Sequence, residues 1–192
     1  MVTRGQGGRG YAPPSEPKLN ILWQLLPAPS GNCEELGITV MQSDIRLAKQ
    51  PALAGLKHLN RLEYVLAAKR CSQGVALLLD TEGYIVETLA HNIFCVIDGE
   101  LVTPILDDCG VKGVLRTLIE QQLAPQLGLV FTERKLKPND LATATEVFVG
   151  NSVRGIWPVT GAHFLDIAHL SWPLGPVAAK LQQAWLCYVS LS

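Results

Sequence analysis

The chain has 192 residues, of which 48% are hydrophobic and 17% are charged. This composition excludes a largely disordered protein, and the length suffices for one large domain or two small ones around a buried core. The formal net charge is −1 and the basic residues form no runs, so the sequence indicates neither a nucleic-acid partner nor a membrane surface as a partner.

The cysteines and histidines indicate neither a disulfide framework nor a metal site. No cysteine pair has C-x-x-C spacing, and the four histidines lack the spacing of metal ligands. The first residues have no apolar signal core, and no apolar run approaches the roughly 20 residues that span a bilayer. These features predict a cytoplasmic protein. The cysteines are Cys33, Cys71, Cys95, Cys109 and Cys187.

The first 18 residues are rich in Gly and Pro and are predicted to be a loop. Residues 21–27 (ILWQLLP) are predicted to form a short buried strand, and residues 37–41 (GITVM) a second strand. A helix is predicted after residues 53–58 (LAGLKH), because Leu62, Val65, Leu66 and Lys69 have helical spacing.

Two features locate the start of that helix and the strands that follow it. Asn60 and Glu63 have the spacing of a capping box, which places Lys57 just before the first turn. Two hairpins are predicted next, with turns at residues 81–83 (TEG) and at Asp98-Gly99, a dipeptide suited to a type I′ turn.

The last part of the chain is predicted to contain a helix, three strand segments and a closing helix. The helices span residues 113–127 and 176–188, and the strand segments span 130–135, 146–149 and 155–159. This order of elements predicts an α+β fold rather than a doubly wound parallel sheet.

Lys57 is a candidate for covalent chemistry, because apolar residues precede it and a helix starts just after it. Only a neutral amine attacks a carbonyl, and desolvation lowers the pKa of lysine toward that state. A solvated surface lysine is the alternative, and it is the commoner case for a lysine at a helix entrance.

Glu87 closes the predicted strand GYIVETL and shares a face with Ile85 and Leu89. A carboxylate among aliphatic residues is costly unless it is paired, and a protonated pyridine nitrogen would be a suitable partner. The alternative interpretation is an edge-strand glutamate that faces solvent.

Two backbone segments are candidates for binding a phosphate. Residues 113–116 (GVLR) open a predicted helix, where free N–H groups and the helix dipole favour an anion. Residues 150–152 (GNS) follow a predicted strand and could add N–H and hydroxyl donors. An ordinary helix start and an ordinary turn remain the alternatives.

Taken in order, these segments resemble the signature of the class IV aminotransferases, which are pyridoxal-phosphate enzymes of fold type IV. The matching motifs are KHLNRLE from Lys57, E-x-x-x-x-N-x-F from Glu87 to Phe94, L-x-T from Leu101 to Thr103, and G-V-x-R from Gly113 to Arg116. The resemblance extends from Arg4 to about Pro158. It implies the large C-terminal domain of that fold, with a mostly antiparallel barrel-like sheet flanked by helices.

The resemblance also implies roles for individual residues. Lys57 would bind the aldehyde of pyridoxal 5′-phosphate and then act as acid and base, and Glu87 would pair with the pyridine nitrogen. The remaining assignments are the backbone of Val114 and Leu115 with Asn151 and Ser152 for the phosphate, and Arg9, Tyr11 and Arg4 for the substrate carboxylates. Leu89 departs from the small residue that the family prefers there, and it could crowd the ring.

Within the family, residues 4–11, the lysine segment and residues 150–159 resemble the corresponding segments of the 4-amino-4-deoxychorismate lyases. These carbon–oxygen lyases form 4-aminobenzoate and pyruvate on the way to folate. Branched-chain or D-amino-acid aminotransferase activity is one alternative, and an inactive fragment acting only as a folded subunit is another. The resemblance implies a homodimer, an interdomain loop remnant at 1–18, a cofactor-binding domain at 19–192, and a small N-terminal domain missing from this chain.

Overall fold

The computed structural model describes residues 1–5, 7, 10–27 and 33–190, which belong to two units, Met1–Ser30 and Gly31–Ser192. In the first unit, β1 (Val2–Thr3) pairs antiparallel with β2 (Asn20–Ile21). The prediction of a buried strand over 21–27 is wrong, because β2 ends at Ile21 and the side chain of Trp23 is 87% exposed. A ribbon two residues long offers no sheet face against which this apolar run could pack.

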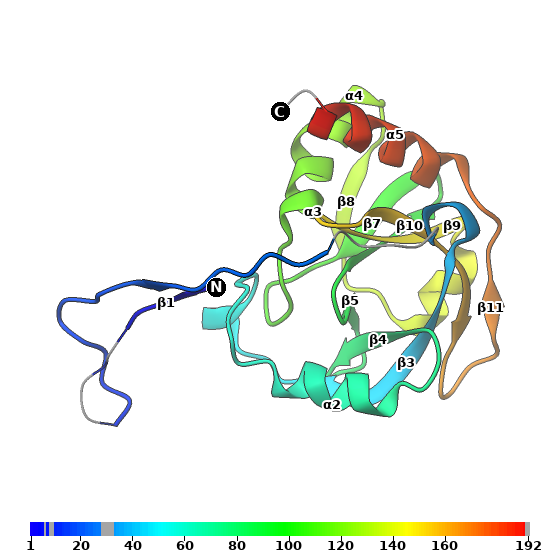
Figure 1. Cartoon of the computed structure of the whole chain (residues 1–192). Coiled ribbons are helices and arrows are strands. Elements are labelled where there is room, and N and C mark those ends of the chain that lie inside the picture. Colours follow the sequence, from blue (N-terminus) through cyan, green and yellow to red (C-terminus); the bar gives the residue numbers. More distant parts are fainter. Residues whose placement is uncertain (6, 8–9, 28–32, 191–192) are drawn as a thin grey trace. The chain divides into compact units, whose positions relative to one another are not determined.

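The second unit is built on a sheet that closes into a barrel (Figure 1). Six strands form the closed ring in the order β3–β4–β5–β6–β9–β10, and β10 pairs back with β3. The sheet continues from β6 into β7 and β8, and from β10 into β11. The strands are β3 (Ile38–Leu47), β4 (Val75–Asp80), β5 (Ile85–Thr88), β6 (Asn92–Ile97), β7 (Glu100–Pro104), β8 (Phe131–Arg134), β9 (Glu146–Asn151), β10 (Gly155–His163) and β11 (Leu170–Ser171).

Most strand pairs are antiparallel, and the parallel pairs are β3–β10, β3–β4 and β7–β8. Helices flank the barrel, with α2 along β3 and β4 and with α3, α4 and α5 together elsewhere on the sheet (Figure 1). The predicted α+β class and barrel-like sheet are therefore confirmed. The helical segments are α1 (Cys33–Leu36), η1 (Pro51–Leu53), α2 (Leu62–Arg70), α3 (Val114–Leu118), the π-helix η2 (Ile119–Leu123), α4 (Ala124–Gln126), η3 (Pro138–Thr143) and α5 (Pro176–Ser190).

The local predictions succeed for the hairpins and fail for one helix cap. Asp98 and Gly99 have φ of 52° and 81°, as a type I′ turn requires. The predicted capping box at α2 is wrong, because Arg61 occupies the N-cap position without a side-chain cap. The Glu63 carboxylate accepts a hydrogen bond from the Ala48 N–H at 2.9 Å instead, which ties α2 to the end of β3.

The core consists of three clusters of buried apolar side chains. The first fills the barrel, and it takes residues from all six ring strands: Val40, Leu77, Ile85, Cys95, Val147 and Val159. The second packs α3, η2 and α5 onto the sheet around Phe94 and Phe148, whose ring centroids are 5.2 Å apart. The third joins Ala67 of α2 to the β3–β5 side of the sheet. Among the described residues, no helix combines the length and the apolar character needed to cross a membrane.

Candidate active site

Glu87 lies on β5 and its side chain is only 4% exposed. One carboxylate oxygen, Oε1, accepts a hydrogen bond from the Tyr64 hydroxyl at 2.5 Å. The other, Oε2, accepts from the Val111 N–H at 3.1 Å and from Asn92 Nδ2 at 3.3 Å. The solvent-facing alternative for Glu87 is therefore wrong, since this carboxylate is buried and held from three directions.

Burial raises the pKa of Glu87 to about 7, because a buried carboxylate loses its hydration. Hydrogen bonds from Tyr64 and Val111 act in the opposite direction, as do the positive charges of Arg61 and Lys57. Such a group near neutral pH in a site with a nearby amine is suited to sharing a proton with a basic ring nitrogen.

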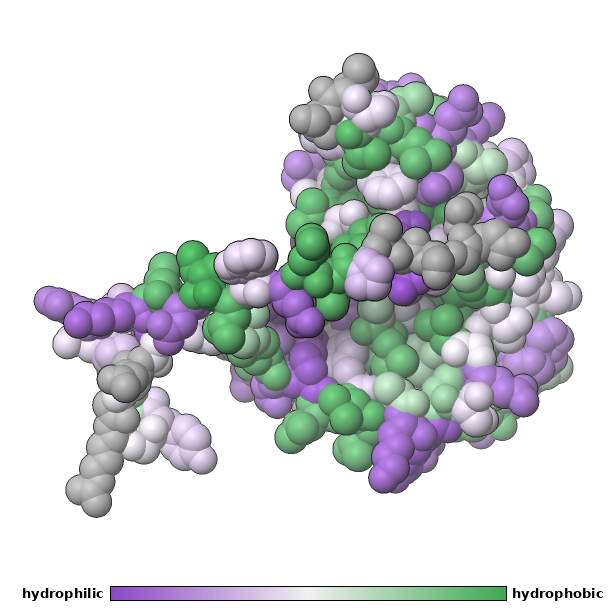
Figure 2. Space-filling view, in the orientation of Figure 1, coloured by the Kyte–Doolittle hydropathy of each residue, from purple (hydrophilic) through white to green (hydrophobic). Residues whose placement is uncertain are grey.

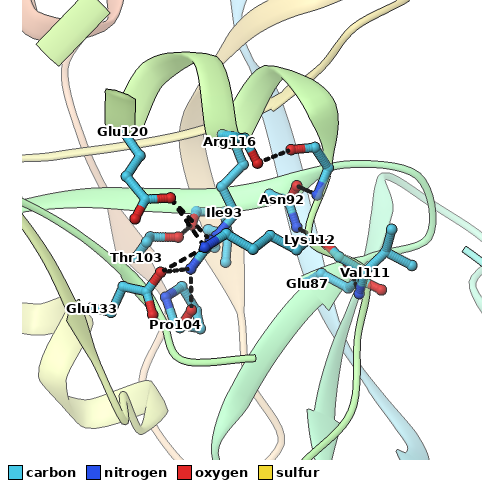
Figure 3. A network of polar contacts seen from close by, with 12 residues as sticks. Glu87, Asn92, Ile93, Thr103, Pro104, Val111, Lys112, Arg116, Glu120 and Glu133 are labelled. Atoms are coloured by element: carbon cyan, nitrogen blue, oxygen red, sulfur yellow. Dashed lines mark hydrogen bonds and ion pairs between the residues drawn. The ribbon is translucent and has the colours of Figure 1, made fainter. Parts of the chain in front are cut away.

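Asn92 links Glu87 to the start of α3 (Figure 3). Its Nδ2 also donates to the Val111 carbonyl at 2.8 Å, and its Oδ1 accepts from the Gly113 N–H at 3.2 Å. A Cβ on Gly113 would come within 2.4 Å of that Oδ1, so only glycine permits this close approach. One side chain thus fixes both the carboxylate and the backbone that enters α3.

The loop that carries Lys57 is tied to the same segment. Gly55 donates to the Gly110 carbonyl at 3.1 Å and accepts from the Lys112 N–H at 3.0 Å. Arg61 donates to the carbonyls on both sides of Lys57, to Leu56 at 2.9 Å and to His58 at 3.1 Å. The expected desolvation of Lys57 is wrong, because the residue is exposed, and its charge acts on Glu87. The fold therefore brings together the lysine and the glutamate that the sequence places 30 residues apart.

The first turn of α3 has its N–H groups free of intrahelical acceptors, as at any helix start. The Val114 side chain is exposed and the Leu115 side chain is buried in the second core cluster. Arg116 is also buried, and it donates from Nη2 to the Pro104 carbonyl at 3.1 Å and to Glu133 at 2.8 Å (Figure 3). The arginine of the motif therefore anchors the helix to β7 and β8.

Asn151 and Ser152 lie at the turn between β9 and β10, and Asn151 contacts Ala90. Asn151 Oδ1 accepts from the N–H groups of Val153 and Arg154 at 2.9 and 2.8 Å, and its Nδ2 donates to the Ala90 carbonyl at 3.0 Å. The Asn151 amide is thus engaged in shaping the turn. The exposed Ser152 hydroxyl and the backbone of the turn are what it offers to a ligand.

The predicted substrate-binding residues belong to the first unit. Arg4 and Tyr11 are exposed there, and Arg9 lies outside the described residues. Their assignment to the substrate stays a prediction. Leu89 packs against the third core cluster. Within the described part of the chain, no group of three or more His, Cys, Asp and Glu residues is placed to hold a metal ion.

Three residues of this site received no role from sequence reasoning: Arg61, Tyr64 and Asn92. Asn92 stood within the motif, so its pattern was visible but its hydrogen bonds were not. Arg61 and Tyr64 follow Lys57 by four and seven residues on or beside α2. Arg61 and Tyr64 are three positions apart at the start of α2, and this helical spacing was the available signal, because residues three positions apart share one face of a helix.

The barrel and the site define an α+β class of protein in which hydrogen bonds connect a lysine loop, a buried glutamate and a helix start beside a closed ring of strands. Residues 1–162 match the family model of amino-transferase class IV, so the chain belongs to that family. Its fold is accordingly that of the fold type IV pyridoxal-phosphate enzymes.

The known proteins that resemble the chain belong to two classes of activity, lyases and aminotransferases. It is 33% identical to an aminodeoxychorismate lyase from Vibrio harveyi, over 94% of this chain and 68% of that protein. It is 30% identical to a branched-chain-amino-acid aminotransferase from Escherichia coli strain K12, over 96% of this chain and 62% of that protein.

Solved structures give the same two classes. The 4-amino-4-deoxychorismate lyase from Pseudomonas aeruginosa superposes with a TM-score of 0.83 at 41% identity, over 95% of this chain and 67% of that chain. The Escherichia coli branched-chain aminotransferase gives 0.74 at 28% identity, over 97% and 63%. A T.th. branched-chain aminotransferase, complexed with N-(5′-phosphopyridoxyl)-L-glutamate, gives 0.68 at 26% identity, over 80% and 52%. The chain thus spans between about half and two thirds of the lengths of these proteins.

Proposed function

We propose that the chain binds pyridoxal 5′-phosphate, the cofactor of its family, through Lys57 and Glu87. The observation that carries this proposal is the buried Glu87 carboxylate, held by Tyr64, Asn92 and Val111 next to the Lys57 loop. When bound, the cofactor supplies an aldehyde for an amine and a ring that stores negative charge.

The residues of the site fit the three functional groups of that cofactor. The Lys57 amine would bind the aldehyde and afterwards move protons, and Glu87 would face the ring nitrogen. The N–H groups of Val114 and Leu115, with the turn at Asn151 and Ser152, would hold the phosphate, since helix starts and polar turns attract anions. Gly113 supports this assignment, because its missing Cβ lets the α3 backbone close on Asn92.

For the reaction, we propose a 4-amino-4-deoxychorismate lyase, which releases 4-aminobenzoate and pyruvate. The lyases at 33% and 41% identity support it. Lys57 would place the proton while pyruvate leaves, and the aromatic product makes the step strongly downhill. Arg4, Arg9 and Tyr11 would contact the two substrate carboxylates. A branched-chain or D-amino-acid aminotransferase is the second candidate, supported by the relatives of that activity, and a folded subunit without activity is the third.

We also propose that two copies of the chain associate through an apolar face, defined by six exposed side chains: Leu53, Leu56, Leu59, Leu62, Val65 and Leu66. They follow one another through η1, the lysine loop and α2. Exposed apolar side chains grouped in this way are typical of a protein interface. The face includes Leu56 and Leu59, which flank Lys57 and His58 in the sequence, so a second copy would lie beside the lysine.

Trapping the cofactor on the lysine tests the binding proposal. The chain is incubated with pyridoxal phosphate, reduced with borohydride, digested and analysed by peptide mass spectrometry. We expect a single stable adduct on Lys57, which disappears in Lys57→Ala and persists in the control Lys69→Ala, an exposed lysine of α2. Labelling spread over many lysines, or an unchanged yield in Lys57→Ala, would sink the proposal.

A second assay separates the two activities. A lyase should release 4-aminobenzoate from 4-amino-4-deoxychorismate without any keto acid. An aminotransferase should consume a branched-chain or D-amino acid only when 2-oxoglutarate is present. Release of 4-aminobenzoate that Lys57→Ala abolishes supports the lyase. A keto-acid-dependent reaction without that release would replace it with the aminotransferase.

A further inference from the structure

Tyr64 makes a hydrogen bond to Glu87, but the proposed function gives Tyr64 no role of its own toward the cofactor. This half-buried side chain projects from α2, and its hydroxyl donates to Glu87 Oε1 at 2.5 Å. Asn92 and Val111 hold only the other oxygen, Oε2. Without Tyr64, the carboxylate would therefore be anchored through one oxygen and free to turn about it.

Tyr64 is itself oriented by its neighbours. The Arg61 guanidinium lies 4.7 Å from the centre of the Tyr64 ring, and Arg61 also holds the carbonyls of the Lys57 loop. The same arginine thus sets the position of the lysine loop and of the phenol. The Tyr64 hydroxyl is aimed at Glu87 by the residue that shapes the backbone around Lys57.

We propose that Tyr64 is a positioning residue, whose hydroxyl favours the ionised form of the Glu87 carboxylate and holds it turned toward the ring nitrogen of the bound cofactor. The role assigned to the ring rests on the proposed function. The effect on Glu87 does not, because the hydrogen bond is present in the protein without any ligand.

A phenol suits this task better than a cation. A hydrogen bond to the charged form of a carboxylate favours ionisation. A neutral donor provides that bond without cancelling the negative charge, so the charge remains available to a protonated pyridine. Burial, and after it the charge of Glu87, raises the pKa of Tyr64 well above its usual range. The hydroxyl therefore keeps its proton throughout the titration of Glu87.

The other groups facing Glu87 do not replace Tyr64. Arg61 and Lys57 act through their charge and lower the pKa of the carboxyl. Burial raises the pKa of the Cys109 thiol to about 12, so that group stays neutral. Tyr64 is thus the donor on Oε1, and its removal should move the Glu87 titration in one direction only.

The test is a titration of Glu87 in the cofactor-free chain, followed by the carbon-13 signal of its carboxyl group and assigned by its loss in Glu87→Gln. The unsubstituted protein should titrate near pH 7. In Tyr64→Phe the midpoint should rise by about one pH unit, the effect of losing a hydrogen bond to a charged group. The matched control is Tyr84→Phe, another half-buried tyrosine, whose ring contacts Lys135 and Lys137 instead. An unchanged or lowered midpoint in Tyr64→Phe, or an equal rise in Tyr84→Phe, overturns the proposal.

A measurement on the unsubstituted protein keeps the test independent of how well the variant folds. The carbon-13 signal of the Tyr64 ring should shift as Glu87 ionises near pH 7 and show no ionisation of its own up to about pH 11. A Tyr64 signal that is flat through the Glu87 titration would overturn the hydrogen bond directly.

Binding of pyridoxamine 5′-phosphate separates failure of this inference from failure of the proposed function. This probe lacks the aldehyde, so its binding does not need the Lys57 amine. Tyr64→Phe should weaken its binding about tenfold, and Tyr84→Phe should leave it unchanged. If the unsubstituted chain does not bind the probe, the proposed function fails, while the Glu87 titration still decides the hydrogen bond to Tyr64. Equal binding by the unsubstituted chain and Tyr64→Phe overturns the role of Tyr64 toward the ring.

Discussion

Burial of the Glu87 carboxylate costs the folded protein free energy, and the same carboxylate is the group that the proposed cofactor would contact. A buried carboxylate loses its hydration, and hydrogen bonds to the charged form recover only part of that loss. Its pKa accordingly rises from 4.5 to about 7 in spite of three donors. A site that was only structural would be more stable with a neutral residue here. The retained carboxylate therefore supports a partner that brings a positive charge.

The raised pKa of Glu87 predicts how the free energy of unfolding changes with pH. The folded protein binds the Glu87 proton more tightly than the unfolded chain, so it holds more protons between about pH 4.5 and 7. The contribution of Glu87 to the free energy of unfolding therefore falls as the pH rises through that window, by up to about 3 kcal/mol. Glu87→Gln should become more stable relative to the unsubstituted chain between pH 5 and 8, as measured by urea unfolding without cofactor.

The exposed Glu35→Gln of α1 serves as the matched control and should show no such change in relative stability. His91 has the opposite dependence, because burial lowers its pKa to about 4 and its contribution grows as the pH rises from about 4 to 6.5. That contribution is common to all three proteins and cancels in the comparison. A relative stability of Glu87→Gln that stays constant with pH would contradict the raised pKa.

At the scale of the element, the start of α3 joins the proposed cofactor site to the rest of the sheet. Asn92 and Gly113 set its position on one side, and the buried Arg116 fixes the helix to β7 and β8 on the other. The helical run then continues through the π-helix η2 and α4. The contacts that position α3 at the site are thus made by its first residues.

Gly113→Ala should disturb this entry. The new Cβ would meet Asn92 Oδ1 at 2.4 Å, so Asn92 must move and release Val111 and the Gly113 N–H. We expect a loss of about 2 kcal/mol of stability, the cost of buried polar groups left unpaired. Binding of inorganic phosphate and of pyridoxamine phosphate should weaken as well.

Gly128→Ala is the control for this prediction. Gly128 has φ of 67° with open space around its Cβ position, so its substitution strains the local backbone without touching the site. It should cost about 1 kcal/mol and leave ligand binding unchanged. Unchanged phosphate binding in Gly113→Ala would mean that the start of α3 does not hold the phosphate.

At the scale of the whole molecule, the apolar face of η1, the lysine loop and α2 is a feature that a single copy leaves unexplained. Figure 2 shows hydrophobic surface over the α2 side of the barrel, next to hydrophilic residues. Exposed leucines at successive turns of a helix are expected where another protein covers them. Their continuity with the Lys57 loop connects association with the state of the site.

A double substitution, Leu62→Glu with Leu66→Glu, should convert a dimer into a monomer, because it places charges in the proposed apolar interface. Sedimentation velocity over a range of concentrations measures the change. Val130→Glu is the control, since Val130 is exposed before β8 and away from α2. A chain that is monomeric at all concentrations, or a dimer that the double variant leaves intact, would refute this interface.

The local patterns of the sequence determined much of the fold. Alternation and turn residues located both hairpins, and periodicity located α2, α5 and the helical run after Gly113. These predictions succeeded because hydrogen bonds and side-chain directions within an element repeat with a fixed period. The strand at 21–27 failed for the complementary reason, since an apolar run becomes a buried strand only where a sheet is available to receive it.

The motif around Lys57 and Glu87 identified the family and its cofactor from the sequence alone, because the spacing of functional residues is a property of the chain. The tertiary structure decided that Glu87 is buried, that Asn92 joins it to α3 and that Tyr64 holds its second oxygen. These contacts connect residues of different elements, with separations of 5 to 24 positions along the chain. Their geometry follows from the closure of the barrel, which no local pattern encodes.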